Sequence, residues 1–120
     1  MCIRDRLYSF DEGAPDPDLK RFSIHHDRAY ILPSLEQARQ ENPDLFLFST
    51  PWSPPGWMKA NGSMLGGCIR KRYYASYAQY FVKFLEAYAA EGVSIQAVTS
   101  QNEVDTDQDG RCLLYTSRCV

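Results

Sequence analysis

The chain has 120 residues, of which 44% are hydrophobic and 23% are charged, and its formal net charge is −2. These values are ordinary for a soluble globular protein and offer no basic surface to a nucleic acid, so we expect a small or neutral partner. No apolar run approaches the roughly 18 residues that a membrane span needs, so no integral membrane segment is predicted, and the N-terminus lacks the apolar core of a signal peptide.

The two ends of the chain match neither the periodicity nor the composition of their neighbours. Residues 1–6 and 112–120 resemble translated adapter sequence, so we expect non-native tails around a native segment 7–111. Three of the four cysteines fall in these tails, which leaves Cys68 alone and removes the disulfide interpretation that an even count suggests. There is no C-x-x-C pair, and the adjacent His25 and His26 would point in different directions, so no metal or other cofactor is predicted.

The first third of the native segment predicts a loop followed by a helix. Residues 7–21 are polar and rich in Gly, Pro and Asp, which is typical of a loop. Asp27 is a candidate N-cap for a helix that starts at Ala29 or Leu32, ends near Gln40 and tolerates Pro33 in its first turn. The spacing of its apolar residues puts three of them on one face: Ile31, Leu35 and Ala38.

Two short apolar runs, 45–49 and 93–99, have the length of β-strands, and the first is apolar enough for a strand covered on both faces. A helix over about 73–91 separates them, and Gly92 is suited to cap its C-terminus. Its apolar residues recur at helical spacing: Tyr74, Tyr77, Ala78, Phe81, Phe84, Leu85 and Tyr88. The order of elements predicts an α/β fold with parallel strands whose C-terminal ends share one face.

The loop between the first strand and the second helix, residues 50–72, holds three Pro, four Gly and both Trp residues. A loop of this length inside a compact domain is usually functional. Trp52 and Trp57 suit either a ligand-binding wall or a hydrophobic plug. Lys59 and the cluster Arg70–Arg72 are interpreted as solvated charges.

The second strand ends in Gln101, Asn102 and Glu103, which places a carboxylate where barrel enzymes keep catalytic groups. A glycosidase needs a carboxylic acid that can reach the glycosidic oxygen and a neighbour that binds sugar hydroxyls, and an Asn-Glu pair can supply both. From spacing alone, the favoured interpretation of Glu103 is a loop carboxylate that caps the next segment, and the Asn-Glu pair shifts the balance towards catalysis. The stretch 105–110 resembles the start of a calcium loop but lacks the distal Glu.

Three stretches together resemble glycoside hydrolase family 30. They are the loop Ser49–Lys59, the helical run Tyr77–Tyr88 and the strand end Thr99–Glu103, and the resemblance covers nearly all of residues 7–111. It implies a fragment of a (β/α)8 TIM barrel from a retaining β-glycosidase of the glucosylceramidase or β-glucanase kind. Many members carry Pro after the Asn-Glu pair, whereas this chain has Val104, which suggests a subgroup difference.

The resemblance also implies roles for the matched residues. Glu103 would be the general acid/base, Asn102 would bind the 2-hydroxyl of the sugar, and Trp52 would form a wall of that subsite while Trp57 supports the loop. The substrate would be a β-linked saccharide or glycolipid. A retaining enzyme also needs a nucleophilic carboxylate at about 5 Å from the first. In this family it lies on a later strand, so we expect residues 1–120 to be inactive alone.

Two other functions stay open at this point. The first is a non-catalytic carbohydrate-binding barrel protein that keeps the aromatic wall and lacks the chemistry. The second is an unrelated nucleotide-binding α/β domain, which is disfavoured because Gly62, Gly66 and Gly67 do not form a phosphate loop. The resemblance is compatible with secretion, and the sequence leaves the location open.

Overall fold

The computed structural model describes residues 7–102. Its helices and strands, in chain order, are η1 (His25–Ala29), α1 (Ile31–Glu41), β1 (Phe48–Ser49), η2 (Gly56–Met58), η3 (Lys71–Tyr73), α2 (Tyr74–Ala90) and β2 (Ala97–Val98). The segment before η1 forms neither helix nor strand, which confirms the predicted N-terminal loop. None of the helices within this part of the chain is long and apolar enough to cross a bilayer.

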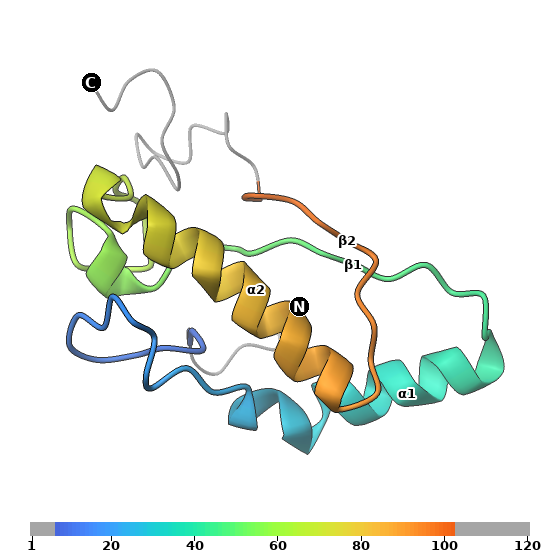
Figure 1. The fold of residues 1–120 in the computed structure, drawn as a ribbon. Coiled ribbons are helices and arrows are strands. Elements are labelled where there is room, and N and C mark those ends of the chain that lie inside the picture. The colour runs from blue at the N-terminus through green and yellow to red at the C-terminus, as the bar shows by residue number, and fades with distance from the viewer. Residues whose placement is uncertain (1–6, 103–120) are drawn as a thin grey trace.

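The two strands are parallel and adjacent, with Phe48 opposite Ala97 and Ser49 opposite Val98. Helix α2 connects them and lies alongside the extended segments that carry both strands (Figure 1). This is the crossover arrangement that the order of elements predicts. The regular strands are shorter than the apolar runs that predicted them.

Helix α2 spans 17 residues and ends at the predicted glycine. Gly92 has a φ of +82°, a left-handed conformation that only glycine adopts at low cost. The amide of Val93 donates to the carbonyl of Tyr88 at 3.0 Å and the amide of Gly92 to that of Ala89 at 3.0 Å, which is the pattern of a Schellman motif. The helix therefore stops because its last carbonyls are satisfied at this glycine.

The buried side of α2 differs slightly from the predicted one. Tyr77, Phe84 and Tyr88 are buried as expected, whereas Tyr74 and Ala78 are exposed and Tyr80 is buried in their place. Two clusters of buried residues follow from this face. One packs at the N-terminal half of the helix (Leu19, Trp57, Met58, Ile69, Tyr73, Tyr77, Tyr80) and the other at its C-terminal half (Ile24, Leu32, Phe84, Tyr88, Val93).

Helix α1 forms close to the predicted bounds, but the predicted cap is wrong. Asp27 lies inside η1, and the N-cap of α1 is Tyr30, which makes no side-chain cap hydrogen bond. The Asp27 carboxylate is 2% exposed and accepts hydrogen bonds from the hydroxyls of Tyr8 and Tyr88 instead. Tertiary hydrogen bonds to two tyrosines thus replace the local cap because they satisfy a carboxylate that the core has buried.

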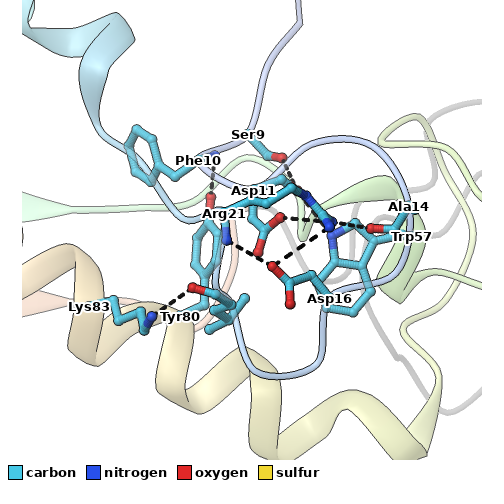
Figure 2. Close-up of polar contacts among 10 residues, drawn as sticks. Ser9, Phe10, Asp11, Ala14, Asp16, Arg21, Trp57, Tyr80 and Lys83 are labelled. Atoms are coloured by element: carbon cyan, nitrogen blue, oxygen red, sulfur yellow. Dashed lines mark hydrogen bonds and ion pairs between the residues drawn. The ribbon is translucent and has the colours of Figure 1, made fainter.

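The N-terminal loop packs on α2 and on the loop after β1 (Figure 2). The amide of Phe10 donates to the hydroxyl of Tyr80 at 2.9 Å, and Lys83 donates to the carbonyl of Leu19 at 2.6 Å. The indole N–H of Trp57 donates to the carbonyl of Asp11 at 3.0 Å. These bonds hold residues 10–19 against the helix although the segment has no regular secondary structure.

Strand β1 is not covered on both faces, contrary to the sequence-based expectation. Phe46 and Phe48 are each 64% exposed, while Leu45 and Leu47 are half-buried. The apolar side chains alternate between a face packed on the helices and a face left open within residues 7–102. The predicted tails and the boundaries of segment 7–111 lie outside the described residues.

Candidate active site

The hydrogen bonds between the two parallel segments continue beyond the regular strands. The amide of Gln96 donates to the carbonyl of Leu47 at 2.9 Å, and the amide of Thr99 to that of Ser49 at 3.0 Å. Further along, the hydroxyl of Thr99 donates to that of Thr50 at 2.9 Å. The two chains therefore stay in register as they leave the sheet, and the polar residues that follow them arrive at the same edge.

At this edge the structure brings Asn102 and Trp52 together. The amide of Asn102 donates to the carbonyl of Pro51 at 3.0 Å, and the side-chain amide of Gln101 donates to the carbonyl of Trp52 at 2.7 Å. Both Asn102 and Trp52 are partly exposed, as a ligand contact requires. Glu103, the predicted acid/base, lies outside the described residues and directly follows Asn102 in the chain.

The loop that carries Trp52 is built around a buried lysine. Lys59 is 0% exposed, and its ammonium group donates to the hydroxyl of Ser53 at 3.1 Å and to the carbonyl of Met64 at 3.0 Å. The expectation that Lys59 is a solvated charge is therefore wrong. The ammonium group stays buried because oxygen acceptors from both arms of the loop replace its water.

The rest of this loop is closed by backbone pairing. Lys59 forms an isolated antiparallel bridge with Ile69, and the amide of Arg70 donates to the carbonyl of Met58 at 2.9 Å. A Cβ on Gly56 would lie 2.9 Å from the carbonyl oxygen of Gly62, so only glycine permits this close approach. Arg70, Lys71 and Arg72 are exposed, which confirms the interpretation of that cluster.

Trp57 and Cys68 serve the structure of the same loop. Trp57 is 7% exposed and packs edge-on against Tyr73 with ring centroids 5.0 Å apart, so it supports the loop as predicted. Cys68 is disulfide-bonded, so the expectation that it forms no disulfide is wrong.

A cavity of about 290 Å³ lies beside the strand end and includes Trp52 in its lining. Its walls come from the N-terminal loop, from α1 and α2, from β1 with the loop after it, and from the segment before β2, and they include Phe10, Leu35, Leu47 and Ile95. The cavity thus extends into the apolar space between the strands and the helices, and Trp52 is one of its lining residues.

Burial raises the pKa of several ionisable groups in the segments that support the strand ends. Burial raises the pKa of the Asp11 carboxyl, the nearby Asp16 raises it further, and Arg21 opposes the shift. Burial also raises the pKa of the Tyr77, Tyr80 and Tyr88 hydroxyls, so all three stay protonated. Their role here is to hold these segments, since their hydroxyls donate to a carbonyl or carboxylate or accept from a backbone amide.

Sequence reasoning missed the residues that position the site. Lys59 was visible as a lone charge in a stretch rich in Trp, Pro and Met, and such a setting is a signal for burial with acceptors. The sequence shows Gln101 only as part of a polar strand end, because its bond to the Trp52 carbonyl depends on the register of two segments far apart in sequence. The sequence does not indicate that Asp11 and Asp27 are buried, and it favours Asp27 as a helix cap, because only the packing of the N-terminal segment on α2 buries these carboxylates.

Comparison with known proteins gives one family. Residues 2–118 match the family model described as the glycosyl hydrolase family 30 TIM-barrel domain. Among curated proteins, the putative glucosylceramidase 4 of Caenorhabditis elegans is 44% identical over 85% of this chain, and the endo-1,6-beta-D-glucanase of Neurospora crassa is 39% identical over 80%. The chain spans 21% of the length of each of these relatives.

Solved structures agree with the sequence matches. The crystal structure of SrfJ from Salmonella typhimurium superposes with a TM-score of 0.79 and 32% identity, covering 91% of this chain and 25% of that protein. The parallel strands and crossover helix described above are therefore part of a TIM barrel. The chain belongs to glycosyl hydrolase family 30.

Proposed function

We propose that this chain carries the acid/base half of the active site of a retaining β-glycosidase. In this proposal Glu103 protonates the departing glycosidic oxygen and later activates water, Asn102 binds a sugar hydroxyl, and Trp52 packs against the sugar ring. The observation that carries the proposal is the junction at the strand ends. There the backbone bond from Asn102 to Pro51 puts the residue before Glu103 beside the residue before Trp52.

The chemistry of this junction favours hydrolysis of glycosides. A carboxyl group that follows a parallel strand is held by the sheet, and a neighbouring amide can bind a hydroxyl more strongly as the transition state develops. A partly exposed indole next to them supplies a flat apolar surface for the C–H groups of a sugar. Together these groups provide a proton, an orienting hydrogen bond and a stacking surface.

We further propose a β-linked glucoside as substrate. The relatives' names include a putative glucosylceramidase and an endo-1,6-beta-D-glucanase, which suggests a shared glucosyl unit with different leaving groups. A role in sphingolipid metabolism would follow if the leaving group is ceramide.

The test uses the full-length protein that contains this sequence. It is incubated with glucosylceramide, with β-1,6-glucan and with an aryl β-glucoside, and the anomeric form of the first product is followed by NMR. We expect hydrolysis with formation of the β-anomer first, because two successive displacements restore the configuration. Formation of the α-anomer first, or sugar binding without hydrolysis, would contradict the proposal.

A further inference from the structure

The side chain of Gln101 connects the two halves of the site described above. Its Nε2 donates to the carbonyl of Trp52 at 2.7 Å, and the residue is 7% exposed. A carbonyl can only accept a hydrogen bond, so the amide nitrogen must face Trp52 and the orientation of the amide is fixed. Within residues 7–102, Oε1 of Gln101 has no hydrogen-bond partner, so the bond to Trp52 is the one this buried amide makes there.

The position of Gln101 makes this bond relevant to the reaction. Gln101 immediately precedes Asn102 and Glu103, and its partner is the backbone of the aromatic residue across the strand ends. Any movement of the Trp52 backbone away from the strand of Asn102 must stretch or break this bond. The backbone bond from Asn102 to Pro51 at 3.0 Å lies one residue away on each side, so the two bonds together define the spacing.

We propose that Gln101 is a positioning residue, which fixes the backbone of Trp52, and with it the base of the indole side chain, relative to Asn102 by donating a hydrogen bond to the Trp52 carbonyl. This inference rests on the proposed glycosidase function. It assigns Gln101 no contact with the sugar, and its effect on catalysis passes through Trp52.

A second glutamine provides a matched control. Gln96 lies on the same segment as Gln101 and also bridges to the backbone of the β1 segment, but its Oε1 accepts from the amide of Leu47 at 2.8 Å. A carboxylate can replace the acceptor of Gln96, whereas an ionised carboxylate cannot replace the donor of Gln101. Substitution of glutamate for glutamine therefore keeps the hydrogen bond of residue 96 to Leu47 and breaks the hydrogen bond of residue 101 to Trp52.

The experiment measures kcat/KM against pH for the full-length protein carrying Gln101→Glu, Gln101→Leu or Gln96→Glu. Gln101→Leu should lower kcat/KM at every pH by about a hundredfold, since small displacements at a reacting centre cost that much. Gln101→Glu should approach the wild type at acid pH, where the protonated carboxyl still donates to Trp52. Its activity should fall at a lower pH than that of the wild type, and Gln96→Glu should keep the wild-type profile.

The direction of the shift separates positioning from a simple charge effect. A new carboxylate near Glu103 would raise the pKa of the acid and move the alkaline limb of the profile to higher pH. A shift to higher pH, or an unchanged profile in Gln101→Glu, would overturn the role of Gln101 while leaving the glycosidase proposal intact. Failure of the wild type to hydrolyse any glycoside would instead contradict the proposed function.

A measurement without turnover also decides the role of Gln101. Amide hydrogen exchange of the segment 50–53 should be faster in Gln101→Leu than in the wild type, because that segment loses its tie to the neighbouring strand. Gln96→Glu should leave exchange in this segment unchanged. Equal protection in all three proteins would overturn the proposal whether or not the enzyme is active.

Discussion

The buried carboxyl group of Asp11 depends on a hydrogen bond from a residue further along the chain. Asp11 is 0% exposed, and only one of its carboxylate oxygens has a partner in the described residues, Arg21 at 3.4 Å. Burial is the main cause that raises its pKa above the ordinary 3.8. The folded chain therefore keeps this proton at pH values where the unfolded chain has released it.

The pH dependence of stability follows from that shift. Protonation of Asp11 favours the folded state fully below the ordinary pKa, and this contribution is lost as the pH rises through the raised folded pKa. We expect Asp11→Asn to gain stability relative to the wild type as the pH increases from about 4 to about 7. Thermal unfolding of the full-length protein at both pH values measures this difference.

Asp18→Asn is the matched control for this test. The Asp18 side chain is 73% exposed beside Lys20, so its substitution should change stability about equally at both pH values. A stability difference between Asp11→Asn and the wild type that shrinks with rising pH, or does not change, would contradict the assigned effect of burial.

The sequence predicts the role of some side chains, and fails for others whose partners lie on distant segments. Trp57 supports the loop and Arg70–Arg72 are solvated, as expected. Lys59, Asp27 and Gln101 differ from expectation, or were not singled out, because their partners come from distant segments. A single sequence gives the chemistry of each donor or acceptor but does not identify the group that it meets.

Among the elements, helix α2 and the turn that ends it were the most predictable part of the chain. The helix has a strong apolar period and ends at Gly92, whose φ is +82°. Strand lengths were less predictable, since β1 and β2 each span two residues although hydrogen bonds between the two segments extend further. Apolar runs mark where a strand passes but do not show how long its partner stays in register.

The turn at Gly92 gives a test of this account of α2. A Cβ at Gly92 would have no atom within 4 Å, so Gly92→Ala changes only the backbone preference. We expect a loss of about 1–2 kcal/mol in the free energy of unfolding, the cost of a left-handed conformation for a residue with a side chain. Denaturant unfolding of the full-length protein measures it.

Asparagine tolerates the left-handed conformation better than alanine, which supplies the comparison. Gly92→Asn should therefore lose less stability than Gly92→Ala. Equal losses in both variants, or no loss in either, would mean that the conformation at residue 92 does not determine where α2 ends.

At the scale of the whole chain, the fold is that of the family, and apolar side chains are exposed on and beside both strands. The family match and the parallel strands confirm the predicted TIM-barrel architecture, while the chain spans 21% of the length of the relatives it resembles. Phe46, Phe48 and Val98 are exposed by 64%, 64% and 38% on and beside the two strands. Apolar side chains on an open pair of strands favour association with other chains.

We therefore expect the polypeptide 1–120, produced alone, to self-associate and to lack glycosidase activity. Sedimentation velocity would show species larger than the 13.8 kDa monomer, and an aryl β-glucoside would stay intact. Phe48→Lys should reduce association, because a charge then blocks the open face, whereas Glu86→Lys on the exposed side of α2 should not. A monodisperse, active polypeptide would contradict both expectations.

If Glu103 protonates the leaving group, as proposed, the leaving-group dependence of Glu103→Gln in the full-length protein shows it. We predict that the variant loses nearly all hydrolysis of the natural β-glucoside, whose leaving group needs a proton. It should still release the activated leaving group of a dinitrophenyl β-glucoside in a rapid first step. Wild-type rates on both substrates, or an equal loss on both, would contradict the assignment of Glu103 as the general acid.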